Sequence, residues 1–375
     1  MNQDITTSES GASDRNAELA RYGFGPAWLE SVSSCEALAR EVAEAPFRTG
    51  RILRVERGEC DVATADGIER VASDSLRSQG EIAPVTGDWV IIGETDVGAV
   101  IACIVERQRT LARRDPSEQV IEQVMVANID NAFLIHGLDR PLRPGRLERF
   151  LVLAWDSGAT PVVVLTKSDL DDSGAQADAL VGVIGAVAGD VSVVLTSAVT
   201  GFGLPALDQW LVATTTTALL GESGSGKSTL VNSLIGDEIQ ETGEVRRSDA
   251  KGRHTTITRD LLLLPSGALI VDTPGIRAVG LWDADDALRQ VFGDIVELAG
   301  GCRFNDCAHG AEPGCAVQNS VSDGTTDYRR LDRFKSMQAE LDEQAEKQLQ
   351  RQRKEGSGKR GGKNQGRRHQ GGRRR

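Results

Sequence analysis

The sequence predicts a multidomain chain with a small β-barrel, an α/β domain built on a mostly parallel sheet, and a helical C-terminal domain that contains a Cys/His loop. A chain of 375 residues is longer than one compact core usually extends. Short β-like runs come first, alternating strand and helix patterns follow, and a cysteine cluster precedes charged helical sequence. These three changes of pattern predict the domain order.

We expect five segments. They are an acidic N-terminal extension over 1–45, a barrel over 46–113, an α/β domain over 114–298, a metal-binding domain with helices over 299–350 and a basic disordered tail over 351–375. No run of 18 apolar residues is present, so we expect no membrane span. The polar N-terminus lacks a secretory pattern, which predicts a cytoplasmic protein with a monomer as the default state.

The N-terminal third predicts an amphipathic helix over 17–43 and then five short strands separated by turn-forming residues. Five strands with few intervening helices favour the oligonucleotide-binding barrel, or OB-fold. A small β-barrel that serves only as a spacer is the alternative, because strand count does not separate the two. The expected strands are Gly50–Val55, Glu59–Ala63, Gly67–Val71, Asp88–Ile92 and Ala99–Val105.

The middle of the chain alternates apolar strand-like runs with helical stretches, which predicts a mostly parallel sheet with helices on both faces. The expected strands are Ala132–His136, Pro161–Leu165, Val191–Leu195, Thr217–Leu220 and Ala268–Val271. The expected helices between them are Arg146–Asp156, Gln176–Ala188 and Leu204–Val212.

A phosphate-binding loop follows the strand Thr217–Leu220 and opens a helix over Ser228–Ile235, the context that supports the motif G-x-x-x-x-G-K-[ST]. Its glycines let successive backbone N–H groups point at phosphate oxygens, and the helix N-terminus adds partial positive charge. We expect Lys227 to bridge the β- and γ-phosphates and Ser228 to bind Mg²⁺. The expected phosphate-site residues are Gly221, Glu222, Ser223, Gly224, Ser225, Gly226, Lys227, Ser228 and Thr229.

An acidic residue ends the next apolar strand, in the run Asp272-Thr273-Pro274-Gly275. This is the position at which P-loop proteins hold Mg²⁺ with an aspartate, so Asp272 is a candidate magnesium ligand. The N–H of Gly275 is a candidate γ-phosphate contact. The motif Asp-x-x-Gly alone describes many turns, and its place on an apolar strand after the phosphate loop gives it weight.

A guanine-reading segment, Thr166-Lys167-Ser168-Asp169, follows the strand Pro161–Leu165. The carboxylate of Asp169 can accept hydrogen bonds from the N1–H and the exocyclic amine of guanine, which adenine does not offer. Thr166 stands where Asn is commoner in such motifs. After the next strand, Thr196-Ser197-Ala198 can present a backbone N–H to the guanine oxygen, at the sheet edge where ligands bind.

Four residues near the C-terminus have metal-ligand spacing: Cys302, Cys307, His309 and Cys315. Three thiolates and an imidazole suit one tetrahedral Zn²⁺ per chain, and four protein ligands leave no open position, so the site is expected to be structural. A disulfide with leftover thiols is the alternative. The other three cysteines, Cys35, Cys60 and Cys103, are scattered, and we expect no disulfide framework among the six.

The C-terminal tail is basic. Residues 351–375 hold 11 Lys or Arg and one acidic residue, in a chain whose formal net charge is −12. Positive charge mixed with glycine favours contact with RNA phosphates. A solubilising disordered end is the alternative.

The guanine reader precedes the phosphate loop, the reverse of the order in most GTPases, which a circular permutation can produce while keeping one pocket. With these motifs, residues from about 46 to 340 resemble the ribosome small-subunit-dependent GTPase A family, circularly permuted P-loop GTPases of bacterial ribosome assembly. The resemblance implies GTP hydrolysis stimulated by the small ribosomal subunit, late in its maturation. It also implies an OB-fold barrel, a permuted GTPase domain and a zinc domain that dock on ribosomal RNA.

The segment Gly252–Thr256 lies between the phosphate loop and Asp272. A loop in this position is expected to supply a Thr to Mg²⁺, and Thr255 and Thr256 are both candidates. The residue after Asp-x-x-Gly is Ile276, which cannot orient the attacking water. His254 is the nearest polar alternative in sequence, and the family resemblance implies this catalytic role, although a lone histidine is more often structural.

Two other function classes share part of this pattern. A nucleotide kinase or ATP-driven enzyme would have the same phosphate loop, but the guanine reader and the lack of an Arg-rich lid-like segment argue against it. An RNA-binding scaffold with vestigial nucleotide binding is disfavoured by intact Asp169, Lys227, Ser228 and Asp272. We therefore expect an RNA-activated GTPase.

Overall fold

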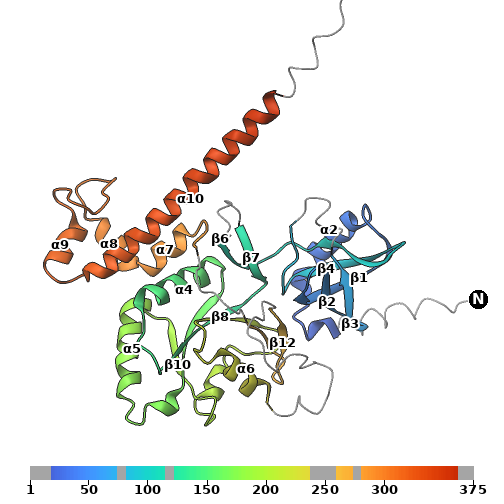
Figure 1. Cartoon of the computed structure of the whole chain (residues 1–375), viewed down its shortest axis with the longest axis horizontal. Coiled ribbons are helices and arrows are strands. Elements are labelled where there is room, and N and C mark those ends of the chain that lie inside the picture. The colour runs from blue at the N-terminus through green and yellow to red at the C-terminus, as the bar shows by residue number, and fades with distance from the viewer. Residues whose placement is uncertain (1–17, 74–81, 115–121, 237–258, 273–279, 362–375) are drawn as a thin grey trace, which may run out of the picture. The chain divides into compact units, whose positions relative to one another are not determined.

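The computed structural model describes residues 18–73, 82–114, 122–236, 259–272 and 280–361 (Figure 1). Two compact units divide the chain. The first comprises Met1–Ala112 and Val124–Val279, and the second comprises Arg113–Gln123 and Gly280–Arg375. Within the described ranges, no helix has the length and apolarity needed to cross a bilayer.

The first unit begins with the closed five-stranded barrel that the sequence predicts, with strand order β1-β2-β3-β5-β4. Its antiparallel neighbours bury alternate side chains in the interior, including Ile52, Val62, Val90 and Ile92. The strands are β1 (Glu44–Val55), β2 (Glu59–Thr64), β3 (Gly67–Ala72), β4 (Trp89–Thr95) and β5 (Gly98–Ile104).

A helix covers the outer wall of the barrel over β4 and β5. The predicted helix over 17–43 is wrong in its length. The chain is helical at residues 18–20, is interrupted at Gly23 and Gly25, and then forms η1 (Pro26–Trp28) and α2 (Leu29–Ala39). Trp28 and the buried face of α2 pack against Trp89 and other outward-facing residues of the strands. Part of the segment expected as an extension is thus folded onto the barrel.

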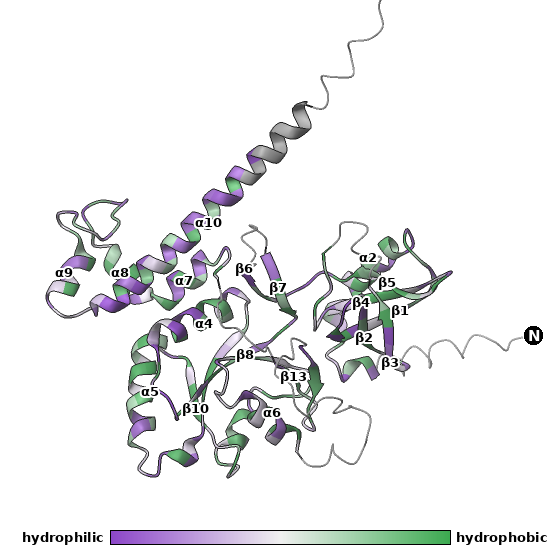
Figure 2. Ribbon diagram, viewed as in Figure 1, coloured by the Kyte–Doolittle hydropathy of each residue, from purple (hydrophilic) through white to green (hydrophobic). Residues whose placement is uncertain are grey.

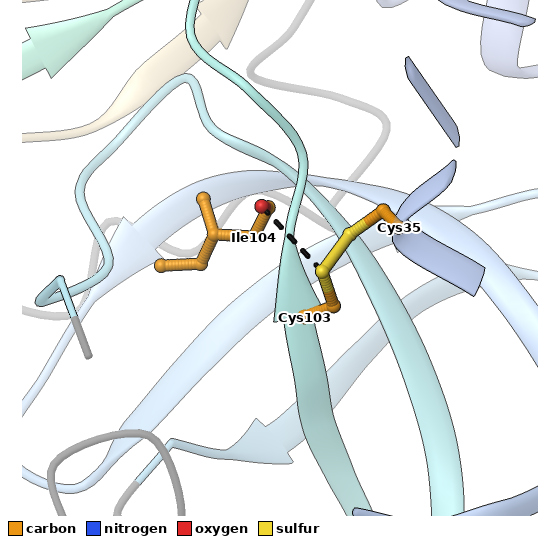
Figure 3. Close-up of a disulfide and its surroundings, with 3 residues drawn as sticks. All are labelled: Cys35, Cys103 and Ile104. Atoms are coloured by element: carbon orange, nitrogen blue, oxygen red, sulfur yellow. Dashed lines mark hydrogen bonds between the residues drawn. A yellow bond between two sulfur atoms is a disulfide. The ribbon is translucent and has the colours of Figure 1, made fainter. Parts of the chain in front are cut away.

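A disulfide joins Cys35 of α2 to Cys103 of β5 (Figure 3). We expected no disulfide framework among the six cysteines, and this one pair departs from that expectation. They are 68 positions apart in sequence, and only the packing of α2 on β5 brings their Cα atoms to 5.9 Å. Cys60 remains a free thiol inside the barrel.

The α/β part of the first unit contains a six-stranded sheet with strand order β10-β9-β8-β11-β13-β12. All neighbouring pairs are parallel except β12 with β13, which confirms the predicted mostly parallel sheet. The short strand β12 was not predicted. The strands are β8 (Asn131–Gly137), β9 (Thr160–Thr166), β10 (Ser192–Leu195), β11 (Thr216–Gly221), β12 (Leu261–Leu263) and β13 (Leu269–Asp272).

Helices cover both faces of this sheet, as predicted. Helices α4 (Pro144–Asp156) and α5 (Ala175–Ala188) pack together on one face, and α6 (Lys227–Ile235) joins the core cluster of the other face. The predicted helix Leu204–Val212 is wrong beyond η3 (Leu204–Leu207). Leu207 and Leu211 have the i, i+4 spacing of a longer helix, but they belong to a single buried turn. In this turn the amides of Trp210 and Leu211 both donate to the Leu207 carbonyl.

The second unit is helical. In α8 the side chain of Asp294 forms two hydrogen bonds with Arg330 of α10, and the Arg330 guanidinium lies 4.8 Å from the centroid of Phe292. The sequence-based boundary at 298 therefore falls inside this unit. Helix α10 continues to Gly361, so the expectation of a disordered tail from residue 351 is wrong for residues 351–361. Hydrophilic residues predominate along the coloured part of this helix (Figure 2). The helices are α7 (Asp285–Val291), α8 (Gly293–Ala299), α9 (Ala316–Ser322) and α10 (Tyr328–Gly361).

A two-stranded ribbon, β6 (Thr110–Arg114) and β7 (Glu122–Ala127), runs at the boundary of the two units in sequence. Neither strand was predicted from the sequence. β6 has only two apolar residues before Arg113 and Arg114, and β7 begins with Glu122 and Gln123, so both give a weak strand signal.

A buried arginine joins the barrel to the α/β sheet within the first unit. The Arg51 guanidinium on β1 donates to the carbonyl oxygens of Tyr22 and Asn128 and, over 2.9 Å, to the hydroxyl of Thr216 at the start of β11. It also lies 5.4 Å from the ring of Trp89. Burial lowers the pKa of Arg51 to about 10, yet it stays charged at neutral pH, and hydrogen bonds offset the cost of its desolvation.

Gly87 lies at the same junction. Its amide donates to Ile52 of the barrel, and its carbonyl accepts from the side chain of Asn128. Its φ of +91° belongs to the left-handed region, and a Cβ there would clash with the carbonyl oxygen of Ala127. The junction therefore requires glycine at this position.

We predict that Gly87→Ala destabilises the first unit by about 2–3 kcal/mol, because it adds both backbone strain and a steric clash. The measurement is the thermal unfolding midpoint. Gly98→Ala is the control, since Gly98 also has positive φ, +114°, but a Cβ added there would meet no atom within 4 Å. Equal losses for the two variants would contradict a tight junction at Gly87.

Candidate functional site

The phosphate loop lies between the buried strand β11 and helix α6, as the sequence predicts. Gly224 and Gly226 have φ angles of +76° and +94°, so the loop curls through conformations that favour glycine. Ser228 and Thr229 are exposed in the first turn of α6. Backbone N–H groups at a helix start form a suitable anion site.

The guanine-reading segment contacts this loop directly. The Thr166 hydroxyl at the end of β9 donates to the carbonyl oxygen of Ser225 over 2.5 Å. A Cβ on Gly226 would lie 2.9 Å from the same hydroxyl, so the close approach requires glycine. Thr in the place of the commoner Asn therefore still ties the two segments together.

Lys167 strengthens this connection. It adopts a left-handed φ of +63°, and its ammonium donates to the carbonyl of Gly224 and to the carboxylate of Asp139, both over 2.8 Å. Gly137, at the end of β8, lies beside the Lys167 stem, because a Cβ there would be 3.4 Å from it. The aliphatic part of Lys167 thus lies across the ends of β8 and β9.

Asp139 and Arg140, which follow β8, were not predicted as site residues. The Arg140 guanidinium donates to the carbonyl oxygens of Ser223 and Gly224 over 3.0 and 2.9 Å, and it also pairs with Asp139. Arg140 and Lys167 hold the pKa of the Asp139 carboxyl far below its usual range. An acidic–basic pair directly after a central strand of the sheet was the available signal.

Glu222, the second residue of the phosphate loop, faces the same arginines. Its carboxylate lies 3.8 Å from Arg140 and forms an ion pair with Arg146 of α4. The outer side of the loop is thus held by side chains from the β8–α4 region.

Lys227 is the first residue of α6 and Asp272 the last residue of β13, and the two side chains are close enough for their charges to interact. The Lys227 ammonium donates to the carbonyls of Gly221 and Glu222 over 2.7 and 2.8 Å, and burial lowers its pKa. Burial raises the pKa of the Asp272 carboxyl. Among the described residues, Asp272 Oδ1 is buried without a hydrogen-bond partner, which fits a place for hydrated Mg²⁺.

Asp169, the predicted base-reading residue, is held by the loop after β10. The Ser197 hydroxyl donates to Asp169 Oδ1 over 2.5 Å, and the Ser168 amide donates to the Thr196 carbonyl. The Ser197 amide already donates to Phe202, so Ala198 is the better candidate for the N–H that meets a guanine oxygen. The Ala198 carbonyl accepts from Ser233 of α6, which connects this loop to the phosphate-side helix.

Four predicted site residues lie outside the described residues: His254, Thr255, Thr256 and Gly275. Their roles therefore stay predictions.

The second unit brings the four predicted metal ligands together, with all their ligand atoms within 4.8 Å of one another. His309 Nδ1 lies 3.6 Å from Cys302 Sγ and 3.5 Å from Cys315 Sγ, and the two sulfurs are 3.8 Å apart. A tetrahedron with metal–sulfur bonds of about 2.3 Å gives sulfur–sulfur separations of about 3.8 Å, so this donor set fits a metal ion.

Local structure positions these ligands. Cys315 caps the N-terminus of α9, where its sulfur accepts from the Gln318 amide. His309 has a left-handed φ of +56°, and its carbonyl accepts from the side chain of Gln318 over 2.6 Å. The positive φ of Gly314, +79°, allows the turn into Cys315.

Comparison with known proteins identifies similar chains over most of the sequence. The RsgA GTPase family model matches residues 104–282. The chain is 41% identical over 335 residues to the small ribosomal subunit biogenesis GTPase RsgA of Streptomyces coelicolor, covering 89% of both proteins. It is 37% identical over 343 residues to the protein of the same name from Methanosarcina acetivorans, covering 91% of both.

Two solved structures share the fold. The YjeQ structure from Thermotoga maritima is 26% identical with a TM-score of 0.56, covering 79% of this chain and 98% of that one. The structure of YloQ, described as a circularly permuted GTPase, is 26% identical with a TM-score of 0.52, covering 79% and 96%. These similarities confirm the permuted order of the motifs.

We predict that Asp169→Asn weakens GTP binding by about 100-fold or more, because the amide can accept only one of guanine's two donors and turns an N–H toward the other. The same amide matches the 2-oxo group of xanthine, so binding of xanthosine triphosphate should improve. Fluorescence titration with GTP and with xanthosine triphosphate measures this change of base preference. An unchanged preference for GTP in Asp169→Asn would show that Asp169 does not recognise the base. Asp178→Asn, in the exposed first turn of α5, is the matched control.

Proposed function

This chain belongs to the RsgA GTPase family and is a GTP-hydrolysing enzyme, and on that premise we propose that it acts in late maturation of the small ribosomal subunit. It would bind the small subunit and its ribosomal RNA and hydrolyse GTP to GDP and phosphate, with the subunit stimulating hydrolysis. The names of its relatives support this role. The observation that best supports GTP as the nucleotide is the direct hydrogen bond from Thr166, in the guanine-reading segment, to the phosphate-loop carbonyl of Ser225.

Within this proposal, the guanine reader Thr166–Asp169 selects the base and Ala198 presents an N–H to it. The loop Gly221–Ser228 and the first turn of α6, including Thr229, bind the phosphates. Lys227 would exchange its two loop carbonyl partners for phosphate oxygens, which better offset its buried charge.

Magnesium would be held by the Ser228 hydroxyl and by Asp272, with one of Thr255 or Thr256 as a further ligand. The buried, unpartnered oxygen of Asp272 supports its place in this set. Gly275 would offer its N–H to the γ-phosphate. When bound, Mg²⁺ neutralises phosphate charge, while the protein groups orient the nucleotide.

His254 is the proposed residue that orients the attacking water. The reason is chemical: Ile276 follows Asp-x-x-Gly and has no hydrogen-bonding group. A neutral imidazole can accept a proton from water near neutral pH.

The metal proposed for the second unit is a single structural Zn²⁺. Three sulfurs and one imidazole nitrogen form a soft donor set that suits zinc, and all four positions are filled by the protein. Metal binding would fold the loop around Cys302–Cys315, which has little apolar core of its own.

The remaining segments are proposed to meet RNA. The OB-type barrel and the basic tail are suited to phosphate contact, and we propose a cytoplasmic monomer that works without a membrane. The five segments 1–45, 46–113, 114–298, 299–350 and 351–375 stay the proposed division, except that residues from Gly280 to 298, with α7 and most of α8, are assigned to the helical unit of the metal site.

We predict that purified small subunits raise GTP hydrolysis at least about tenfold, by completing the catalytic geometry. His254→Ala should bind GTP normally but lose most of the stimulated rate. Phosphate release with and without subunits, together with GTP affinity, measures both effects. Absence of stimulation in the natural protein would overturn the ribosomal role, whereas full stimulation of His254→Ala would overturn only the role of that histidine.

We predict one zinc per chain in freshly purified protein. Cys302→Ser should reduce the zinc content and lower the unfolding midpoint of the second unit, since the metal stabilises its loop. Metal analysis by mass spectrometry measures the content, with Cys60→Ser as the control because Cys60 lies in the barrel. Full zinc content in Cys302→Ser would reject the proposed ligand set.

A further inference from the structure

Two barrel residues hold the chain just before β12. The Arg54 guanidinium on β1 donates to both carboxylate oxygens of Asp260, over 2.7 and 2.5 Å. The Thr86 hydroxyl, in the loop before β4, donates to the carbonyl of Arg259 over 2.8 Å. These bonds join residues more than 170 positions apart, so they connect the barrel to the α/β part of the first unit.

Asp260 is placed to influence the magnesium-side strand. It directly precedes β12, whose first residue, Leu261, pairs with Val271 of β13. Asp272 is the next residue of β13, so the held segment is laterally adjacent to this candidate magnesium ligand. In sequence, Asp260 also lies four positions after Thr256.

The ion pair differs from an ordinary surface pair. Both side chains are 30% exposed, and the two parallel N–H···O bonds fix the carboxylate in one orientation. Exposed pairs add little to global stability, so its main effect is expected to be local positioning. Arg48 on the same strand offers a comparison, because its pairs with Glu69 and Glu94 lie entirely within the barrel.

We infer that Arg54 is a positioning residue for GTP hydrolysis: through Asp260 it lets the barrel set the position of β12 and of the adjacent strand end that carries Asp272. The barrel then acts on the nucleotide site without contributing an atom to it. A partner that displaces or reorients β1 would shift Asp260, and this shift would reach the magnesium side of the site. Contacts of the guanine base and of the phosphates with the segments after β9 and β11 would be little affected, because none of them involves β12.

This separation has a structural basis. The base-reading and phosphate-loop contacts involve β8, β9 and β11, whereas Asp260 lies by β12, the far edge strand next to β13. Small displacements of a catalytic group can reduce a rate strongly while leaving ground-state contacts in place. The expected signature is therefore a lower kcat with little change in GDP affinity.

The experiment compares full-length Arg54→Ala, Arg54→Lys, Asp260→Ala and the double variant Arg54→Ala/Asp260→Ala. Three readouts are needed: kcat and KM for GTP with and without small subunits, affinity for a fluorescent GDP, and the unfolding midpoint. Arg48→Ala is the matched control, since it removes a similarly half-buried arginine from β1 without touching Asp260.

We expect Arg54→Ala to lower the subunit-stimulated kcat by about tenfold or more, with GDP affinity changed less than about threefold. Arg54→Lys should recover part of the loss, since it keeps one charged contact. The double variant should be no worse than the single ones, because both act through one ion pair. Arg48→Ala should retain its stimulated rate.

The inference rests on the proposed function. Measuring whether small subunits stimulate the natural protein distinguishes a failure of the proposed function from a failure of the inference. If small subunits fail to stimulate the natural protein, the ribosomal proposal fails, and the basal kcat of Arg54→Ala then decides the inference. If the natural protein is stimulated and Arg54→Ala is stimulated equally, the positioning role is wrong. A loss matched by Arg48→Ala, or additive losses in the double variant, would also overturn it.

Discussion

The nucleotide site depends on the parallel pairing of β8 with β9 on one side and with β11 on the other. Because parallel strands end at the same sheet edge, the segment after β9 and the loop after β11 must meet. Their order along the chain does not alter this. A circular permutation can therefore separate the guanine reader and phosphate loop in sequence while the Thr166–Ser225 hydrogen bond still joins them.

The two ends of the permuted domain acquire different neighbours. On one side, buried Arg51 and the tight turn at Gly87 fix the barrel against the start of β11, and Arg54 holds the segment before β12. On the other, the strand that ends at Asp272 leads in sequence toward the unit with the Cys/His cluster. The barrel thus contacts the start of β11, which leads into the phosphate loop. The second unit follows, in sequence, the strand β13 that ends at Asp272.

Strong local patterns made much of the fold predictable from the sequence. Short β-like runs separated by turn-forming residues predicted the five barrel strands, and strand–loop–helix context located the phosphate loop. The Cys35–Cys103 disulfide and the Arg54–Asp260 bond escaped prediction, because tertiary packing alone brings those residues together. Arg140 was missed because its contacts with the phosphate loop join residues 83 and 84 positions apart. The turn at Leu207–Leu211 was mistaken for a longer helix because one buried turn has the same apolar spacing.

The central claim is that motifs in reversed order form one guanine nucleotide site. A structure of the full chain with Mg²⁺ and a non-hydrolysable GTP analogue tests it most directly. The account predicts the guanine within hydrogen-bond distance of Asp169 and the β- and γ-phosphates within the loop Gly221–Ser228 of the same molecule. A nucleotide whose base lies away from Asp169, or whose phosphates bind elsewhere, would contradict it.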